Sequence, residues 1–257
     1  MTARQAFDHI SGRARRLLRY HDGLVNVRQR AMRRDWKQSC CKFMHWKKDA
    51  SIDRVDSKDA LLILRDGAGL TRHDFSAAAL DDLLRASLAL GVSALDRYLH
   101  ERVVKKIVKS LRSSDLRAIQ EKLTIPATLA VRMTEDWKKA SRSGRPTRPA
   151  NQLRISLQDA LHLRTFQSWR EIEEAFELIG ITGIAGTLQA AYALADIKPI
   201  KTQLNTLVQR RHRIVHEGDL VRHKRAGHSR VNPIKRKYVA DSLDFMDTFV
   251  GHLDGIA

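Results

Sequence analysis

Apolar residues recur at three- and four-residue steps through most of this chain, which is the spacing of an amphipathic α-helix. The longest stripe covers about seven helical turns and consists of Leu84, Leu88, Val92, Leu95, Leu99, Val103 and Ile107. Asp74 or Ser76 can cap the start of this helix. Strict alternation of apolar and polar residues, which marks a half-buried strand, is nearly absent. The pattern therefore predicts an all-α fold.

The same spacing places further helices on both sides of the long one. They cover residues from about 4 to 34, two segments between Asn151 and Ala195 with the first ending near Gly180, a segment from Pro199 to Gly218, and a last helix that starts at Asn232-Pro233. Proline suits a first helical turn, and glycine suits the residue after a helix end. We expect these helices to form an antiparallel bundle.

Positive charge is concentrated in two segments of the 257-residue chain, whose formal net charge is +18. Residues 1–48 hold thirteen Lys/Arg against three acids, and residues 210–237 hold ten against two, which gives +10 and +8. Two solvated basic helix faces would explain this, but two such patches favour a polyanionic partner, nucleic acid ahead of a membrane surface. We divide the chain into a basic helical N-terminal extension at residues 1–56 and a helical domain at residues 57–257.

Cysteine content and hydropathy indicate the compartment. Cys40 and Cys41 are adjacent and cannot join distant parts of the fold, which fits a reducing environment. Arginines interrupt the apolar residues near the N-terminus, so no signal peptide is predicted there. The longest uncharged stretch, residues 178–195, contains three glycines and is interpreted as buried loop and helix. The sequence predicts a cytoplasmic protein that does not cross a membrane.

Aromatic and basic residues are interleaved after the first predicted helix. Trp36, Phe43 and Trp46 lie among lysines in residues 36–56, without a clean helical period. Such a segment can stack on bases while it binds phosphates. The competing interpretation, which we favour from the sequence, is that these aromatics fix a loop to the core.

The predicted helix before Gly218 ends in a cluster of arginine and histidine. On a helical wheel of about 100° per residue, Arg211 falls in the middle of the apolar stripe, between Leu207 and Ile214. A buried guanidinium needs an anion or a hydrogen-bond network, unless the side chain reaches out to solvent. His212 and His216 lie one turn apart on the flank of the same stripe. The spacing allows either a functional site or a structural helix end.

A metal site is a weaker alternative for the two histidines. Histidines four residues apart can bind zinc, but the protease pattern requires glutamate directly after the first. In this chain Arg213 occupies that position, and its charge opposes a cation. Glu217 and Asp219 can add ligands, but we predict that no metal is bound.

The segment from Arg210 to Leu220 resembles the signature of HEPN domains, in which an arginine, a polar residue and a short spacer precede a histidine near a helix end. Arg211 matches the arginine, His212 the polar residue and His216 the histidine. Arg210 can be counted as the arginine instead.

Two further stretches, residues 91–101 and 165–173, resemble the branch of HEPN domains named for fusions to ribosomal L-PSP proteins. The resemblance covers residues 57–255.

This resemblance implies a HEPN-type bundle with metal-independent endoribonuclease activity and no cofactor. A ribose 2′-hydroxyl would attack the neighbouring phosphorus, with His216 moving the proton and His212 assisting. Arg211 would stabilise the charge on the phosphoryl oxygens. Since Arg211 and His216 differ by about 140° on one ideal helix, they would meet across the twofold axis of a homodimer, as HEPN domains commonly dimerise.

The resemblance and the charge pattern also predict residues that support catalysis or contact RNA. The family often places a supporting polar residue on the long helix, where Asp96 and Glu101 lie, and Arg210 adjoins the motif. The charge pattern assigns RNA contacts to Arg213, Arg222, Lys224, Arg225 and Arg230, and to Arg13, Arg15, Arg16 and Arg19 of the N-terminal helix.

HEPN domains of this kind often act as toxins or in phage defence. Two alternatives stay open. One is a non-catalytic RNA- or partner-binding module. The other is a toxin controlled by a nucleotidyltransferase antitoxin, which could modify a tyrosine such as Tyr98.

Overall fold

The computed structural model describes residues 1–25, 28–29, 33–50, 52–56, 61–65, 69–112, 149–221 and 230–256, with a few single residues between 131 and 142. The elements are α1 (Ala3–Leu24), β1 (Arg28–Gln29), α2 (Arg34–Phe43), β2 (Ile52–Asp56), β3 (Leu61–Arg65), the 3-10 helix η1 (Arg72–Phe75), α3 (Ala77–Arg112), α6 (Pro149–Leu161), α7 (Trp169–Glu177), α8 (Ile184–Ala191), α9 (Lys198–Glu217) and α10 (Arg236–Asp254). The chain is mostly helical, so the predicted all-α class is confirmed, although three short strands were not predicted. Within these ranges no helix is long and apolar enough to span a membrane.

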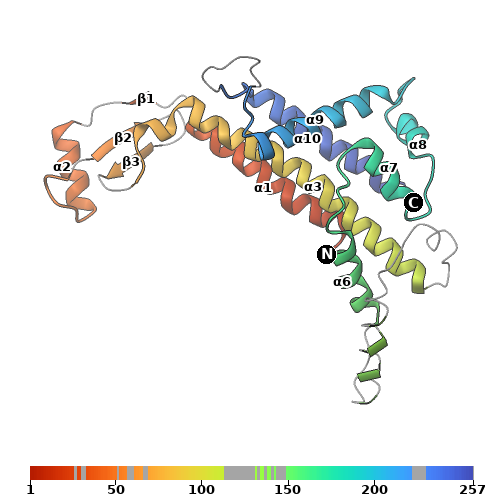
Figure 1. Cartoon of the computed structure of the whole chain (residues 1–257). Coiled ribbons are helices and arrows are strands. Elements are labelled where there is room, and N and C mark those ends of the chain that lie inside the picture. The colour runs from red at the N-terminus through yellow and green to blue at the C-terminus, as the bar shows by residue number, and fades with distance from the viewer. Residues whose placement is uncertain are drawn as a thin grey trace.

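Helix α3 is the axis of the bundle. Helix α1 runs antiparallel beside it, and α9 and α10 pack against this pair (Figure 1). Every residue of the apolar stripe predicted for α3 is at most 1% exposed, which confirms that stripe. Ser76 caps α3 by accepting a hydrogen bond from the backbone N–H of Ala79 at 3.3 Å, whereas Asp74 lies within the preceding 3-10 helix and accepts a hydrogen bond from the backbone N–H of its N-cap, Thr71. A Cβ atom at Gly91 would lie 2.6 Å from Leu243 Cδ2, so this glycine allows α10 to approach α3 closely.

Helix α1 belongs to the same core as the rest of the bundle. Phe7, Ala14 and Leu18 are buried in it, and the Ser87 hydroxyl of α3 donates to the backbone oxygen of Ala14 at 2.8 Å. Three ion pairs then join α1 to α10: Arg4 with Asp247, Arg15 with Asp244, and Asp22 with Arg236. The helix ends at Leu24, ten residues before the predicted end at residue 34. The boundary predicted between residues 56 and 57 falls between β2 and β3, which pair with each other.

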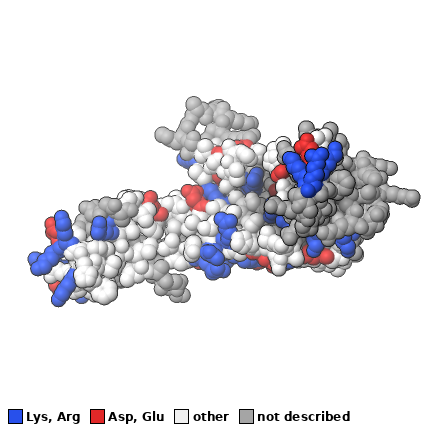
Figure 2. Space-filling view, turned by 90° about the horizontal axis from the view of Figure 1, so that it is seen from below, with Lys and Arg blue, Asp and Glu red and all other residues white. Residues whose placement is uncertain are grey.

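A three-stranded antiparallel sheet, in the order β1-β2-β3, follows α1 together with α2. These strands escaped the sequence analysis because two to five residues are too few for an alternating pattern, and β2 carries three charges in five positions. The sheet and α2 form one end of the molecule, where Lys and Arg side chains gather (Figures 1 and 2).

The aromatic residues of this end do not fix it to the core, so the sequence-based expectation is wrong for two of the three. Phe43 is 83% exposed and Trp36 is 53% exposed, and Cys41 is the one buried residue of α2. Only Trp46 is half-buried, with the guanidinium carbon of Arg65 5.6 Å from the centre of its ring.

Three helices, not two, occupy the region between residues 149 and 195. The break that was not predicted lies between α6 and α7, where Ser168 caps α7 in a capping box with Glu171. Glu171 also accepts hydrogen bonds from the Thr165 hydroxyl at 2.8 Å and from the Gln167 backbone at 3.0 Å. Although burial alone would raise the pKa of Glu171, these hydrogen bonds and those from Ser168 hold it below its usual value. The carboxylate therefore stabilises the turn between the two helices.

The two C-terminal helices were predicted with one error. Helix α9 has Pro199 in its first turn and ends at Gly218, whose φ of 60° lies in the left-handed region that glycine adopts readily. Helix α10 begins at Arg236 rather than at Asn232. Asn232 does not cap α10, because its side-chain amide donates to the backbone oxygen of Asp219 at 2.8 Å.

Candidate functional site

Helix α9 carries the arginine-histidine motif beyond the edge of the core. Its buried residues are Ile200, Leu204 and Leu207, and none of the ten residues that follow Leu207 in this helix is buried. The last turns of α9 therefore present side chains to solvent, with only part of one flank against the bundle.

His212 and His216 lie side by side on this exposed part. Their ring centres are 4.6 Å apart with 43° between the ring planes, and both side chains are exposed. No hydrogen bond joins either ring to another described residue. Both imidazoles consequently keep their ring nitrogens available to an incoming ligand. The structure thus brings together two of the three residues predicted as catalytic.

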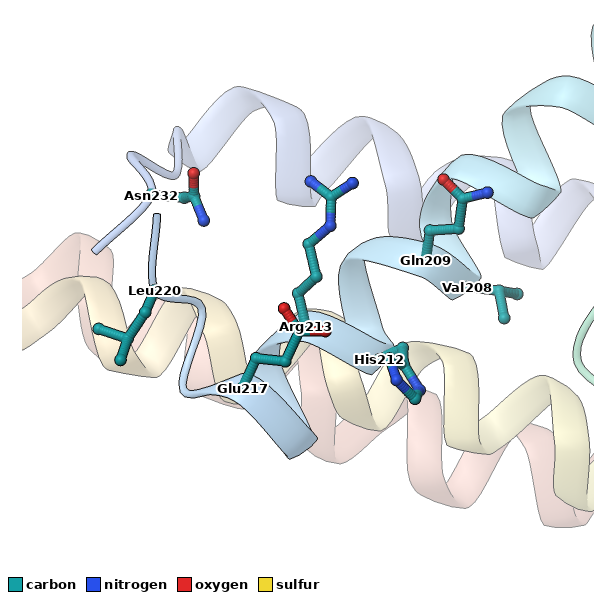
Figure 3. A pocket seen from close by; sticks show the side chains of 7 residues that line it. All are labelled: Val208, Gln209, His212, Arg213, Glu217, Leu220 and Asn232. Carbon is teal, nitrogen blue, oxygen red and sulfur yellow. The ribbon is translucent and has the colours of Figure 1, made fainter. Parts of the chain in front are cut away.

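A hollow of about 540 Å³ opens beside the first of these histidines. Helix α9 lines it with His212, Arg213 and Glu217, and Leu220 and Asn232 face these residues from the segments that follow (Figure 3). Arg213 is exposed, as its predicted role in RNA contact requires. The hollow is large enough for a phosphate and part of a nucleotide.

Arg211 is half-buried, in keeping with its predicted position on the apolar stripe. Its Nε atom is shielded from solvent and has no hydrogen-bond partner among the described residues. The Nε atom of Arg210 is unpartnered in the same way, although Nη2 of that residue is paired with Asp219. Within the described residues, Arg211 makes no hydrogen bond to His216 of the same chain, which agrees with their angular separation on α9.

Arg210 has a structural role instead of a place beside the histidines. Its Nη2 atom lies 2.6 Å from Oδ2 of Asp219, and Nε of Arg85 from α3 lies 3.1 Å from the same oxygen. Asp219 is fully buried, and both guanidinium groups also donate to the backbone oxygen of Asn232. These residues form a buried cluster, here called the Asp219 cluster (Arg85, Arg210, Asp219 and Asn232). Arg210 is therefore engaged in holding the segment after α9 onto the bundle.

The predicted basic loop at residues 222–231 is closed at its base. Leu220 and Val231 form an isolated antiparallel bridge, and the backbone N–H of Val221 donates to the backbone oxygen of Arg230 at 2.7 Å. Arg230 is exposed. Arg222, Lys224 and Arg225 lie outside the described residues.

Asp96 and Glu101 are not placed beside the histidines, in contrast to their predicted supporting role. Asp96 accepts a hydrogen bond from the backbone N–H of Phe166 at 2.6 Å and thereby anchors the segment before α7. Glu101 is 7% exposed and accepts hydrogen bonds from Arg97 and from Gln158 of α6. Both carboxylates join α3 to neighbouring parts of the fold.

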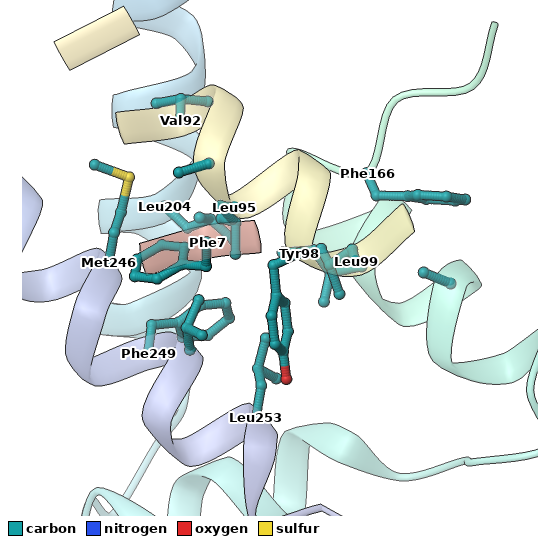
Figure 4. Close-up of a cluster of buried hydrophobic side chains, with 14 of the residues drawn as sticks. Phe7, Val92, Leu95, Tyr98, Leu99, Phe166, Leu204, Met246, Phe249 and Leu253 are labelled. Atoms are coloured by element: carbon teal, nitrogen blue, oxygen red, sulfur yellow. The ribbon is translucent and has the colours of Figure 1, made fainter. Parts of the chain in front are cut away.

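Tyr98 is not accessible to a modifying enzyme in this fold. It is 0% exposed and packs inside the core, with its hydroxyl directed toward α10 (Figure 4). The hydroxyl donates to Asp254 at 2.8 Å and accepts a hydrogen bond from Arg102 at 2.7 Å. Burial raises the pKa of Tyr98 well above its ordinary value. The suggestion that an antitoxin modifies this tyrosine is therefore wrong for the folded chain.

The arginines predicted to contact RNA from α1 are of two kinds. Arg13, Arg16 and Arg19 are exposed. Arg15 is instead partly neutralised, since its Nη1 atom lies 2.8 Å from Oδ1 of Asp244. Three of the four cations on α1 remain suited to a polyanion.

Sequence reasoning missed the residues that hold the motif in place. Asp219 was considered only as a possible metal ligand and Asn232 only as a helix start, and Arg85 lies in a helix that was interpreted from its apolar stripe. The available signal was Asp219 itself, a charged residue directly after the helix-ending Gly218 and flanked by exposed leucine.

The described residues contain no group of three or more His, Cys, Asp or Glu side chains placed to hold a metal ion. A scan against protein-family models found no match for the chain, and searches of curated proteins and of solved structures found none either.

Proposed function

We propose that this chain is an endoribonuclease of the HEPN type, which cleaves RNA without a metal ion. The observation that carries the proposal is the exposed pair His212 and His216, whose ring centres are 4.6 Å apart, with His212 lining a hollow that Arg213 also lines. Two imidazoles and several guanidinium groups provide proton transfer and phosphate binding in one place. The sequence resemblance around Arg211 supports the same chemistry.

In the proposed reaction, His216 accepts the proton of a ribose 2′-hydroxyl as its oxygen attacks the adjacent phosphorus. The bond from phosphorus to the 5′-oxygen breaks, and His212 protonates the departing oxygen. The products are a 2′,3′-cyclic phosphate and a free 5′-hydroxyl. Arg211 stabilises the negative charge that builds on the phosphoryl oxygens, because a guanidinium donates to phosphate in a bidentate manner.

A second copy of the chain completes the site in this proposal. Three apolar side chains in the motif or in the segments that follow it remain open to solvent: Val215 is 49% exposed, Val231 is 48% exposed, and Leu220, which lines the same hollow as His212, is 41% exposed. Exposed apolar groups gathered beside a functional site are typical of an interface. A twofold contact through this surface would bring Arg211 of one copy toward His216 of the other.

The proposal is tested by incubating the purified chain with mixed RNA in EDTA and identifying the 3′ ends of the fragments. We expect cleavage in the presence of the chelator, with 2′,3′-cyclic phosphate ends. Cleavage that EDTA abolishes, or fragments with 3′-hydroxyl ends, would contradict the proposed mechanism.

Charge on α1 supplies a separate prediction for RNA binding. Deleting residues 1–48 would remove Phe7 and other core residues, so the test uses full-length chain with Arg13, Arg16 and Arg19 changed to glutamine. If all three contact phosphates, the slope of log K against log salt becomes less steep by about 2, at about 0.7 for each contact with a single strand. Fluorescence anisotropy with a labelled oligonucleotide measures this slope. Arg170→Gln serves as the control, because Arg170 is 87% exposed on α7, outside the basic segments. Equal salt slopes for the triple variant and this control would show that α1 does not contact the RNA.

A further inference from the structure

Helix α2 presents Phe43 to solvent, with 83% of this residue exposed. Trp36 and Phe43 are seven residues apart, which places them within about 20° of each other on the helix and about 10 Å apart along its axis. Cys41, the one buried residue of α2, lies about 140–160° away on the opposite side. The helix therefore buries Cys41 on one side and presents the ring of Phe43 on the other.

The exposure of these aromatics is unusual for a chain with a large core. Phe43 is 83% exposed, and Met44 beside it is 46% exposed. Helices of ten residues are marginal in water, so the fold holds α2 in place by other means. The backbone N–H of Trp46 donates to Cys41 at 2.8 Å, and the Trp46 ring packs beside Arg65. Phe43 is thus displayed on a helix that its neighbours fix.

Basic residues surround this aromatic face. Residues 33–50 hold six Lys/Arg against two aspartates, a formal net charge of +4. Five of these cations are exposed, namely Arg33, Arg34, Lys42, Lys47 and Lys48. Figure 2 shows the gathering of positive side chains at this end of the molecule. An exposed aromatic ring between cations suits single-stranded nucleic acid, because its bases can stack on the ring while its phosphates contact the cations.

We propose that α2 and the turn after it, residues 33–48, bind single-stranded nucleic acid, with a base stacked on Phe43 and phosphates contacted by Lys42, Lys47 and Lys48. This site is separate from the histidines of α9 and does not rest on cleavage there. Bases stack on aromatic rings whatever their sequence, so the site contributes affinity without sequence preference.

Binding of fluorescein-labelled oligo(dT) of 20 nucleotides to the full chain tests this proposal. This probe lacks the 2′-hydroxyl and is not consumed by the reaction proposed for α9, so the two proposals fail independently. We expect Phe43→Ala to weaken binding at least about fivefold, in keeping with the loss of one base–aromatic stack. The matched control is Leu163→Ala, because Leu163 is also 83% exposed and lies after α6; we expect it to bind as wild type does.

Two further variants separate stacking from other causes. Phe43→Leu keeps an apolar side chain but removes the π-face, so it should weaken binding as Phe43→Ala does. Lys47→Gln with Lys48→Gln should make the salt slope less steep by about 1.4. Oligo(U) of the same length, followed in EDTA with the probe checked for cleavage, should respond to the α2 variants as oligo(dT) does.

Unchanged oligonucleotide binding by Phe43→Ala would overturn the proposal. A second result would also overturn it. In this result, Phe43→Leu still binds the oligonucleotide as wild type does, and the wild-type chain attaches to vesicles of phosphatidylcholine and phosphatidylglycerol in a 3:1 ratio. That combination would identify the aromatic face as a membrane-surface contact. Thermal unfolding of each variant, followed by circular dichroism, should match wild type because Phe43 is outside the core.

Discussion

Replacing Asp219 with alanine is expected to lower the free energy of unfolding by about 3–5 kcal/mol, the usual cost of removing one partner from a buried ion pair. Asp219 is fully buried, and the guanidinium groups of Arg85 and Arg210 converge on one of its oxygens. Without the carboxylate, two cations are left next to each other, with backbone oxygens and, for Arg85 alone, the exposed Asp82 as partners. Urea denaturation followed by circular dichroism measures the change.

Asp82 offers a matched control for this prediction. It also pairs with Arg85, at 2.9 Å, but its side chain is 77% exposed. An ion pair this open to water contributes at most about 1 kcal/mol, so Asp82→Ala should unfold at nearly the same urea concentration as wild type. Similar destabilisation by the two substitutions would mean that the Asp219 cluster does not act as the buried anchor of the segment after α9.

His216→Ala is expected to slow RNA cleavage about 10²–10⁴-fold, the contribution typical of a general acid or base. Because His216 is exposed and makes no hydrogen bond to another described residue, the substitution should leave stability and RNA binding almost unchanged. Single-turnover cleavage in EDTA and anisotropy with the same RNA measure the two effects. His9→Ala is a matched control, since His9 is an exposed histidine on α1 away from the motif.

Loss of cleavage together with loss of binding would not fit the proposed role of His216. Full activity in His216→Ala would place the catalytic proton transfer elsewhere.

A mixture of two inactive variants tests whether the site is shared between copies. In a twofold dimer, a pair formed by one Arg211→Ala chain and one His216→Ala chain has one site in which both residues are intact. Random pairing makes half of the dimers mixed, so about one quarter of the wild-type sites should be recovered. No recovery, with mixed dimers shown by mass spectrometry, would place Arg211 and His216 of a single chain in one site.

The fold was predictable from the sequence where burial alone decides it. The α3 stripe from Leu84 to Ile107 and the helix from Pro199 to Gly218 follow from apolar spacing and end signals, and both predictions are confirmed. The short sheet was not predictable, because its strands depend on pairing between residues distant in sequence. Similarly, Asn232 resembled a helix cap until its long-range bond to Asp219 was visible.

The candidate site was predictable only in its local part. The spacing of His212 and His216 on a helix fixes their proximity, and the structure places their rings together. The sequence could not place Asp96 or Arg210, because Asp96 bonds to a residue 70 positions away and Arg210 bonds to Asp219, nine positions on and past the end of its helix. Charge counting likewise failed for Arg15, whose partner Asp244 belongs to the last helix. Long-range contacts of polar groups decided each of these roles.

The basic segment at residues 222–229 is joined to the bundle through a closed base, so we expect its sequence to be open to change. Its two ends are joined by the Leu220–Val231 bridge and by Asn232, which holds the backbone of Asp219, and both contacts lie within the described residues. Doubling the length of such a segment costs only about 0.6 kcal/mol in chain entropy. We therefore expect an insertion or a charge change between residues 222 and 229 to leave the Leu220–Val231 bridge in place. Selection, or a designer, can retune which polyanion the protein prefers without rebuilding the scaffold.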